Sequence, residues 1–375
     1  MTKHAVIIIP TYNEIGNIKE IIFAIKSQIE LCKGWKVSLL IVDSSSPDGT
    51  ASTVKEIQKN NDFIYLIETK KEGLGKAYIN GFHYALEKLK ADVVFEMDAD
   101  FSHNPKHIPE FLEQIDKGNS FIIGARYIKG GSIPADWGFD RKFFSVLGNL
   151  IIRFGFMKLQ ITDWTSGYRA IKSDIVRNCL PLLDKYSGYV FQVAILDNAI
   201  KQKAKIKEIP INFVDRKEGV SKINSFQYTT QTLFYVFSHS PFIRFVLVGG
   251  SGFLLDMSLV YTFTHILFHI SSSNATMISA STTALYNFLL NNFWSFSHKK
   301  ADSEKKVFAK MIIKYAMVSC GNILIQWSGV KILEMYFGLA FVKQYILIIK
   351  ICIITLFVIP YSYFFYNRFV WKDKK

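Results

Sequence analysis

Cysteine is scarce in this sequence, and the cysteines that occur form no motif. The 375 residues include four cysteines, which are far apart and make no C-x-x-C pair. The spacing therefore indicates neither a zinc site nor a disulfide framework, and it suits a reducing cytosol. A secretory leader is not expected either, because the first apolar run stops at Pro10 and is too short for a signal peptide or a membrane span.

The composition is rich in apolar residues and in positive charge. Hydrophobic residues make up 50% of the chain, aromatic residues 15%, and the formal net charge is +14. These apolar fractions exceed those of typical soluble domains and indicate membrane character. The positive charge suits either nucleic acid or anionic lipid and phosphate-bearing ligands. The uneven distribution of hydrophobic residues favours the second interpretation, so we expect no nucleic-acid partner.

Short β-branched runs alternate with helical patterns in the first part of the chain. The runs lie at residues 6–9, 37–42, 93–97 and 121–123, and segments such as 17–28 and 77–90 between them have helical character. This alternation predicts an α/β domain over residues 1–220, with a mostly parallel sheet covered by helices. In such sheets, ligands bind at the carboxyl ends of the strands.

Four long apolar stretches follow Pro241. They cover about residues 242–268, 275–296, 307–333 and 340–366, and each reaches the ~20 residues that a helix needs to span a bilayer. The alternative is a set of buried helices in a soluble domain, but four such lengths in succession disfavour it. We therefore expect residues 241–375 to form an all-α transmembrane domain with four helices.

The charged residues of this half predict its orientation. Lysines cluster in and beside the second loop, and basic residues fill the C-terminal tail, whereas the first loop at 271–274 has no charge. Cytoplasmic loops carry an excess of Lys and Arg, so both termini and the α/β domain should face the cytoplasm. Within the spans, Asp256 and Lys350 lie at similar depth. We expect either an ion pair between them or a lysine that snorkels to the surface.

Two segments have an amphipathic pattern. In residues 138–158, apolar side chains recur at helical spacing beside a basic fringe, and residues 221–240 place apolar side chains on one face. Such helices can lie in a membrane interface. A core-facing helix of a soluble domain gives the same pattern. Because membrane spans are adjacent, interface helices are the working prediction.

Two aspartates follow an apolar strand at Asp98-Ala99-Asp100. Strand geometry places side chains at i and i+2 on one face, so the two carboxylates can act together. A pair of carboxylates at a strand end suits a hard divalent cation that also holds a diphosphate. A D-x-D pair alone is also common in surface turns, but the apolar strand before this pair distinguishes it.

Three further polar motifs precede expected helices. They are residues 10–14 (P-T-Y-N-E), 43–50 (D-S-S-S-P-D-G-T) and 73–76 (G-L-G-K). Asp and Ser at such positions often act only as helix N-caps. In the functional interpretation, their oxygens bind a base and a ribose, and backbone N–H groups at the helix start meet phosphate.

The order of the motifs resembles that of one group of glycosyltransferases. The series is P-T-Y-N-E, D-x-x-S-P-D-G-T, G-L-G-K-A-Y, M-D-A-D-F-S-H-x-P, G-x-R-Y, S-G-Y-R, G-Y-V-F-Q and F-V-D-R-x-x-G-x-S-K. Over about residues 5–235, the chain resembles dolichol-phosphate (polyprenol-phosphate) mannose synthases, which are family 2 glycosyltransferases of the GT-A type. The membrane half resembles the GtrA-like four-helix domain.

This resemblance implies roles for the matching residues. The nucleotide-sugar site would comprise Pro10, Tyr12, Glu14, Asp43, Asp98, Ala99, Asp100 and Arg126, together with Arg216 and Lys222 from a mobile loop. A divalent cation, Mg²⁺ or Mn²⁺, would be held by Asp98, Asp100 and Ser102. The acceptor phosphate would be bound by Arg141 and Ser145. The catalytic residues would be Asp100, Arg126 and Arg141. Relatives usually carry two consecutive acids where this chain has Asp43-Ser44.

The implied reaction transfers mannose from GDP-mannose to a polyprenyl or dolichyl monophosphate, with inversion, at the cytoplasmic face of the membrane. The acceptor oxygen is ionised at pH 7, so positioning and charge neutralisation suffice for catalysis. This agrees with the lack of an evident catalytic His or Ser-His pair. A UDP-sugar such as UDP-glucose is the alternative donor. For the membrane domain, translocation or scaffolding of the lipid-linked sugar is a further hypothesis.

Overall fold

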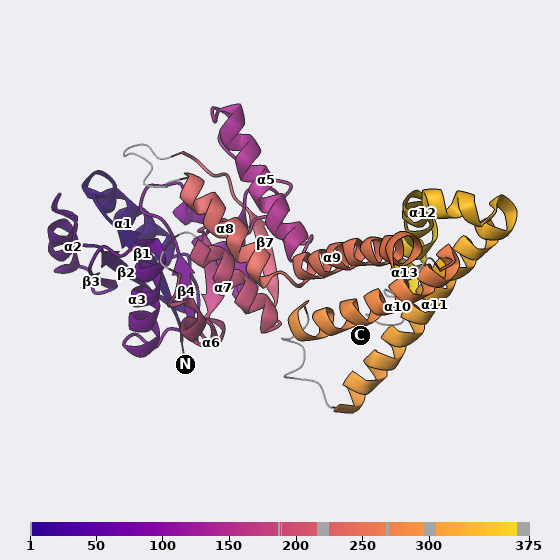
Figure 1. The fold of residues 1–375 in the computed structure, drawn as a ribbon. Coiled ribbons are helices and arrows are strands. Elements are labelled where there is room, and N and C mark those ends of the chain that lie inside the picture. Colours follow the sequence, from indigo (N-terminus) through magenta and orange to yellow (C-terminus); the bar gives the residue numbers. More distant parts are fainter. Residues whose placement is uncertain are drawn as a thin grey trace. The chain divides into compact units, whose positions relative to one another are not determined.

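The computed structural model describes residues 2–186, 188, 190–215, 225–267, 270–295 and 305–365. These residues form two compact units, Met1–His239 and Ser240–Lys375 (Figure 1). Each unit has a hydrophobic core of its own. The two units are therefore described separately.

A mixed sheet of seven strands forms the centre of the first unit. The strand order is β3-β2-β1-β4-β6-β5-β7. Strand β6 is antiparallel to both of its neighbours, whereas the other pairs are parallel. The four β-branched runs of the sequence coincide with β1, β2, β4 and β5, which confirms the expected α/β sheet. The strands are β1 (Lys3–Thr11), β2 (Trp35–Asp43), β3 (Ile64–Glu68), β4 (Val93–Glu96), β5 (Phe121–Ala125), β6 (Arg169–Lys172) and β7 (Ile206–Pro210).

Helices connect these strands and cover the sheet. On one face, Ile7 and Leu39 from β1 and β2 pack with Ile18 and Ile22 of the first helix and with Phe111 of the fourth. Burial of side chains of this size stabilises the unit by about 1.5–3 kcal/mol for each residue. The helices are α1 (Ile15–Ile29), α2 (Thr50–Gln58), α3 (Leu74–Glu87), η1 (Pro105–His107), α4 (Ile108–Asp116), α5 (Phe139–Gly155), α6 (Ser173–Leu183), α7 (Val190–Lys201) and α8 (Ser225–His239).

Helix α3 packs very closely against the sheet at Gly81. A Cβ atom at this position would lie 2.6 Å from Ile8 Cγ2 and 3.2 Å from Val42 Cγ2. The first distance is well inside van der Waals contact, so a larger residue would push α3 away from β1 and β2. Glycine is therefore required here by close packing and not by backbone conformation.

Helix α5 exposes a row of aromatic side chains. Phe139, Phe143, Phe144 and Phe154 are exposed, whereas Ile152 is buried on the opposite side. Helix α8 packs against α5 and likewise exposes apolar side chains, among them Phe234 and Phe237. Neither helix is therefore simply core-facing, because each keeps a large part of its apolar surface outside the core.

The second unit is entirely helical in its described residues (Figure 1). It begins with a capped helix: the Ser240 side chain accepts a hydrogen bond from the backbone N–H of Ile243, and Pro241 occupies the first turn. In the part of this unit that the structure describes, three helices continue into a π-helical turn. The elements are α9 (Pro241–Tyr261), η2 (Thr262–Ile266), α10 (Ser272–Leu290), η3 (Asn291–Ser295), α11 (Lys305–Phe337), α12 (Leu339–Ile353), η5 (Ile354–Val358) and α13 (Ile359–Phe365), where η2, η3 and η5 are the π-helical turns and η1 of the first unit is a 3-10 helix.

Two helices of this unit are long and apolar enough to cross a membrane. Within the described part of the chain they are Ile243–Ile266, with a mean hydropathy of 1.6, and Leu339–Ser362, with 2.2. They fall within the first and the fourth of the apolar stretches that the sequence indicates. The second and third stretches correspond to α10 with η3 and to α11.

An ion pair joins these two helices. Lys350 Nζ lies 2.6 Å from Asp256 Oδ2, and the two side chains are 0% and 4% exposed. The ammonium group also donates a hydrogen bond to Ser279 Oγ at 3.1 Å. This arrangement confirms the expected pair and shows that Lys350 does not snorkel to the surface. A buried pair of this kind holds helices in register, because an unpaired charge in an apolar interior is costly.

Reversal of either charge is expected to destabilise the second unit. Asp256→Lys or Lys350→Asp would place two like charges in contact without solvent, with a cost of about 3–5 kcal/mol or more. The double variant Asp256→Lys/Lys350→Asp restores the attraction and should recover most of this loss. Thermal unfolding of the full chain in detergent measures the effect. A double variant no more stable than the weaker single variant would contradict the pairing.

Candidate active site at the carboxyl edge of the sheet

The ends of β1 and β2 meet at one edge of the sheet. Thr11 and Asp43 are register partners at the last positions of these strands. The Asp43 carboxylate is fully buried and accepts hydrogen bonds from Thr11 Oγ1 at 3.0 Å, from the Ser46 backbone N–H at 2.8 Å and from Ser46 Oγ at 2.7 Å. Asp43 therefore shapes the loop after β2. The Ser44 backbone N–H donates to Thr11 O at 2.9 Å and fastens that loop to β1.

A second set of contacts joins the loops that follow these strands. The Glu14 backbone N–H donates to Thr50 Oγ1 at 3.0 Å, and the Ile15 N–H donates to Asp48 Oδ2 at 3.1 Å. Lys71 Nζ lies 3.6 Å from the centre of the Tyr12 ring. The residues expected to hold the nucleotide, Pro10, Tyr12, Glu14 and Asp43, thus lie at the ends of β1 and β2 and in the connected loops after them. We call this part of the sheet edge the Tyr12–Asp43 rim.

The two aspartates of the D-x-D motif lie just beyond β4. Ser102 donates to Asp100 Oδ1 from its backbone N–H at 3.1 Å and from Oγ at 2.6 Å. Both side chains are buried, so Ser102 fixes the rotamer of Asp100. The Asp98 backbone N–H donates to His103 Nδ1 at 3.0 Å. Asp98 and Asp100 are therefore each oriented by a residue of the segment that follows them.

His103 is a buried, neutral part of this arrangement. Burial lowers the pKa of His103 to about 4, so at pH 7 its ring is uncharged and Nδ1 can accept the Asp98 hydrogen bond. The ring stacks on Tyr168 with centroids 5.0 Å apart. A Cβ at Gly167 would lie 3.3 Å from His103 Cε1 and 2.6 Å from Gln192 Nε2. The S-H-x-P, S-G-Y-R and G-Y-V-F-Q motifs therefore meet at one point.

The backbone is strained at this edge of the sheet. Asn13, Ser45 and Phe101 have φ values of 57°, 56° and 63°, which lie in the left-handed region that disfavours side chains with a Cβ. Each residue follows the end of a different strand, namely β1, β2 and β4. Strain of this kind persists where the surrounding structure enforces it and clusters at functional sites.

The donor set at Asp98 and Asp100 fits a cation that is shared with a phosphate ligand. Among the described residues, no group of three or more His, Cys, Asp or Glu side chains is placed to hold a metal ion. Two carboxylates remain, and both are hard oxygen donors. Mg²⁺ is commonly bound by one or two carboxylates together with substrate phosphates, so this edge is compatible with the predicted divalent cation.

Arg126 extends from the end of β5 into a buried ion pair. Its Nε and one terminal nitrogen each lie 2.8 Å from an oxygen of Asp163, and that nitrogen also donates to Thr165 Oγ1 at 2.8 Å. Although burial acts to raise the pKa of Asp163, the Arg126 guanidinium keeps it below its usual range. The bidentate geometry holds Arg126 rigidly at the end of β5.

Arg169 links three parts of the site from a buried position. Its guanidinium donates to Gln192 O at 2.7 Å and to Trp164 O at 2.8 Å, and it lies 3.7 Å from the fully buried Glu96 carboxylate. Burial raises the pKa of Glu96 to about 7, with Arg169 acting in the opposite direction. Glu96 ends β4 two positions before Asp98. Arg169 therefore holds the end of the strand that leads into the D-x-D motif.

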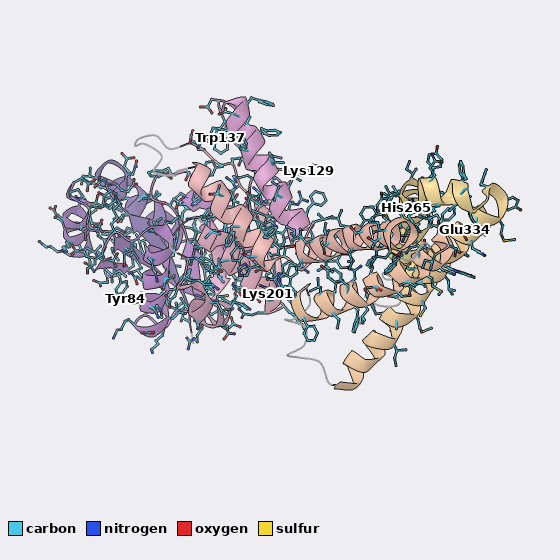
Figure 2. All side chains as sticks on the ribbon, in the orientation of Figure 1. Tyr84, Lys129, Trp137, Lys201, His265 and Glu334 are labelled. Atoms are coloured by element: carbon cyan, nitrogen blue, oxygen red, sulfur yellow. The ribbon has the colours of Figure 1, made fainter. Side chains whose placement is uncertain are left out.

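Arg141 and Ser145 lie one turn apart on α5. The two terminal nitrogens of Arg141 contact the Asp215 carboxylate at 2.9 and 3.3 Å, and its guanidinium stacks 3.9 Å from the Trp137 ring. Trp137, labelled in Figure 2 just before α5, also donates to Asp215 from its indole nitrogen at 3.1 Å. Ser145 Oγ is 2.6 Å from Tyr127 OH. Arg216 and Lys222 lie outside the described residues.

Several residues of the site were not singled out from the sequence. Except for Trp137 and Asp163, they lie inside the recognised motifs, but most of their roles depend on contacts with residues far along the chain. The additional residues are Thr11, Ser46, His103, Trp137, Asp163, Arg169, Gln192 and Asp215. For those inside a motif, the motif itself was the available signal.

Comparison with known protein families accounts for both units. Residues 6–180 match the family described as Glycosyl transferase family 2. Residues 244–371 match the family described as GtrA/DPMS, transmembrane domain. The first match covers most of the sheet and the D-x-D edge, and the second covers the helical unit.

Individual relatives agree with these matches. The chain is 28% identical over 337 residues to the dolichol-phosphate mannosyltransferase of Pyrococcus furiosus, covering 86% of this chain and 89% of the relative. It is 35% identical to the polyprenol monophosphomannose synthase of Mycolicibacterium smegmatis, covering 60% of this chain and 82% of the relative. It is 36% identical to the undecaprenyl-phosphate mannosyltransferase of Micrococcus luteus, covering 58% and 86%.

These comparisons confirm the resemblance that the ordered motifs indicate. The first unit is a GT-A-like α/β domain, and the second carries the transmembrane domain of a membrane protein. The chain belongs to the dolichol-phosphate and polyprenol-phosphate mannosyltransferases of glycosyl transferase family 2, fused to a GtrA/DPMS transmembrane domain.

Proposed function

We propose that this protein transfers mannose from GDP-mannose to a polyprenyl or dolichyl monophosphate and releases polyprenyl-phosphate mannose. The observation that carries the proposal is that three groups follow strand ends at the carboxyl edge of the sheet: the Tyr12–Asp43 rim after β1 and β2, the D-x-D pair after β4, and Arg141, which is held by Asp215 after β7. They supply, in order, acceptors for a nucleoside, ligands for a diphosphate complex and a cation for a second phosphate. The named activities of the relatives support the same reaction class.

Asp98 and Asp100 would hold the divalent cation, Mg²⁺ or Mn²⁺. When bound, this cation neutralises charge on the diphosphate leaving group. Ser102 keeps Asp100 in its rotamer through two hydrogen bonds. His103 orients Asp98 because its Nδ1 accepts a hydrogen bond from the Asp98 backbone N–H. Both supporting groups are uncharged, so the negative charge of the pair stays available to the cation.

The acceptor supplies its own nucleophile. A phosphate monoester is ionised at pH 7, so no side chain has to remove a proton before attack. The work of the protein is to bring two negatively charged molecules together in the correct geometry. Arg141 would bind the acceptor phosphate, with Ser145 one turn further on. Arg126 would act beside the donor from its fixed position against Asp163, and Arg216 and Lys222 would close over the donor.

The exposed aromatic side chains fit a membrane-bound acceptor. Helix α5 carries Arg141 and Ser145 together with exposed Phe139, Phe143 and Phe144. An interface helix places such rings among lipid chains and its basic groups at the head groups. We propose that α8 also lies in the membrane interface. We further propose that the second unit crosses the membrane four times, and that the first unit and both chain ends lie on the cytoplasmic side.

The donor is tested first. The full chain, with polyprenyl phosphate in detergent or nanodiscs, should form a mannosyl lipid from GDP-mannose and little glycosyl lipid from UDP-glucose at equal concentration. Selectivity of about a hundredfold or more in kcat/KM is expected if the site hydrogen-bonds the guanine base. Radiolabelled sugar transferred to the lipid phase is the measurement. Preferential use of UDP-glucose would overturn the assignment of GDP-mannose as the donor. The replacement of the usual second acid by Ser44 would then be the first residue difference to test.

Asp100 is expected to be essential for transfer. Asp100→Ala removes a carboxylate from the diphosphate complex, so kcat should fall by about a hundredfold or more. Chelation of divalent cations should abolish transfer by the unaltered enzyme, and Mg²⁺ or Mn²⁺ should restore it. Asp62→Ala, at an exposed position in the same unit, is the matched control. Near-normal turnover by a folded Asp100→Ala protein would overturn the assignment.

Arg141 is expected to act on the acceptor and not on the donor. Arg141→Ala should raise KM for lipid phosphate about tenfold or more, because a charge-assisted hydrogen-bonding pair is lost. The affinity for GDP-mannose, measured by calorimetry, should stay unchanged. Lys142→Ala removes the adjacent positive charge and serves as the control. A parallel loss of donor and acceptor binding in Arg141→Ala would show that this role is wrong.

A further inference from the structure

The helices of the second unit surround a cavity. Its volume is about 550 Å³, with walls from α9, α10, η3, α11, η5 and α13. Sites that hold small molecules are commonly about 300–1,000 Å³. All of the lining residues belong to this one unit, so the cavity is separate from the edge of the sheet described above.

The walls carry buried polar atoms without hydrogen-bond partners among the described residues. They are Asp256 Oδ1, Thr283 Oγ1, Asn287 Oδ1, Asn291 Oδ1 and Gln326 Oε1. Except for the partly exposed Asn287, these side chains are between 3% and 8% exposed. Leaving a polar atom without a partner in an apolar surrounding costs about 1–3 kcal/mol. A group of five on one cavity therefore indicates a polar ligand.

The charges of the cavity disfavour a phosphate. No arginine or lysine is among the residues that line it in the described part of the chain. The nearby Lys350 is already paired with Asp256 Oδ2 at 2.6 Å, and the other oxygen of that carboxylate is the unpartnered one. An anion would meet a negative group and no available cation.

The unpartnered groups suit hydroxyl groups. Carboxylate oxygens only accept hydrogen bonds, while amide and threonine side chains both donate and accept. A hydroxyl group can serve either function, so a compact molecule with several hydroxyls can satisfy most of these atoms at once. Sugars have this chemistry, and their neutrality matches the balanced Asp256–Lys350 pair.

The backbone is adapted at the same place. Two of the π-helical turns contribute to the walls, η3 through Asn291 and η5 through Ile354 and Val358. Such turns are frequent at functional sites, because the extra residue re-aims the side chains of one turn. At Gly252, a Cβ would overlap Asn287 Oδ1, so glycine there lets Asn287 pack directly against the backbone of α9.

We propose that this cavity binds the sugar of a glycosyl lipid inside the membrane domain. The phosphate of that lipid does not enter the cavity. The inference rests on the proposed function, since the mannosyl lipid that the first unit would make supplies such a sugar. The proposed site is distinct from the one that forms the glycosidic bond.

Photocrosslinking of the full chain in nanodiscs tests the proposal. The probe is citronellyl phosphate mannose with a diazirine on its terminal isoprene unit, and mass spectrometry maps the labelled peptides. Labels on α9, α10 or α11 should be competed by octyl mannoside, which has the sugar but no phosphate. Citronellyl phosphate, which has the phosphate but no sugar, should compete at least about tenfold more weakly.

Two neighbouring glycines provide a matched pair of variants. Gly249 lines the cavity and Gly250 does not, and a Cβ at either position meets no atom within 4 Å. Gly249→Leu should fill the cavity and reduce labelling of the membrane unit about tenfold, as for the loss of several hydrogen bonds. Gly250→Leu should label like the unaltered chain.

A second pair guards against a folding defect in Gly249→Leu. Thr283→Val removes a hydroxyl of the wall at almost constant volume, whereas Thr282→Val alters an exposed residue whose hydroxyl bonds to Ile278 O. Labelling should fall about threefold in Thr283→Val only. Unfolding temperatures of all four variants confirm that they are intact.

The outcomes separate this proposal from the proposed function. Competition by citronellyl phosphate but not octyl mannoside, or equal labelling in Gly249→Leu and Gly250→Leu, would overturn the sugar site. Mannosyl transfer from GDP-mannose is measured on the same samples. If transfer fails while octyl mannoside still competes with the probe, the proposed donor reaction falls and the membrane site stands.

Discussion

The parallel pairing of β1 with β2 and with β4 is the constraint on which the candidate active site depends. It aligns Thr11 with Asp43 and Ile8 with Glu96, so the segments that follow all three strands leave the sheet at the same edge. Each segment then turns through a residue in the left-handed region. Hydrogen bonds within the loops, such as Asp43 with Ser46 and Asp100 with Ser102, hold the strained turns in place. The edge is thereby fixed before any ligand binds, which is the form of preorganisation that electrostatic catalysis requires.

Positive charge at the site is graded by burial. Arg169 is fully buried and holds backbone carbonyl groups, so it acts as part of the framework. Arg126 is nearly buried and is held by Asp163 in bidentate geometry. Arg141 and Asp215 have side chains 49% and 35% exposed, so water and other anions can reach both partners. Exposed pairs contribute little to stability. This series therefore runs from a structural cation to one that can exchange its partner.

The sequence predicts the parts of the molecule that depend on local pattern. The β-branched runs identify β1, β2, β4 and β5, and the D-x-D motif predicts the candidate site at one edge of the sheet, because both signals are contained in a few adjacent residues. The antiparallel strand β6 has the sequence RAIK, with a single β-branched residue between charged ends, so no β-branched run predicts it. The partners of the arginines were also not foreseen, since Asp163 lies 37 residues from Arg126 and Asp215 lies 74 from Arg141. For Asp256 and Lys350, the absence of other charges at the same depth left few alternatives, so the pair could be predicted across almost a hundred positions.

The half-exposed Arg141–Asp215 pair has a consequence for turnover under the proposed reaction. The lipid substrate is a phosphate monoester, which carries close to two negative charges near pH 7 because its second pKa is about 6. The product is a phosphate diester with a single charge, the same as the Asp215 carboxylate. In competition for the Arg141 guanidinium, Asp215 therefore binds more weakly than the doubly charged substrate and about as well as the singly charged product. Under the proposed reaction, the acceptor phosphate would displace Asp215 from Arg141, and Asp215 would help to displace the mannosylated lipid afterwards. The difference in charge between substrate and product would then favour product release.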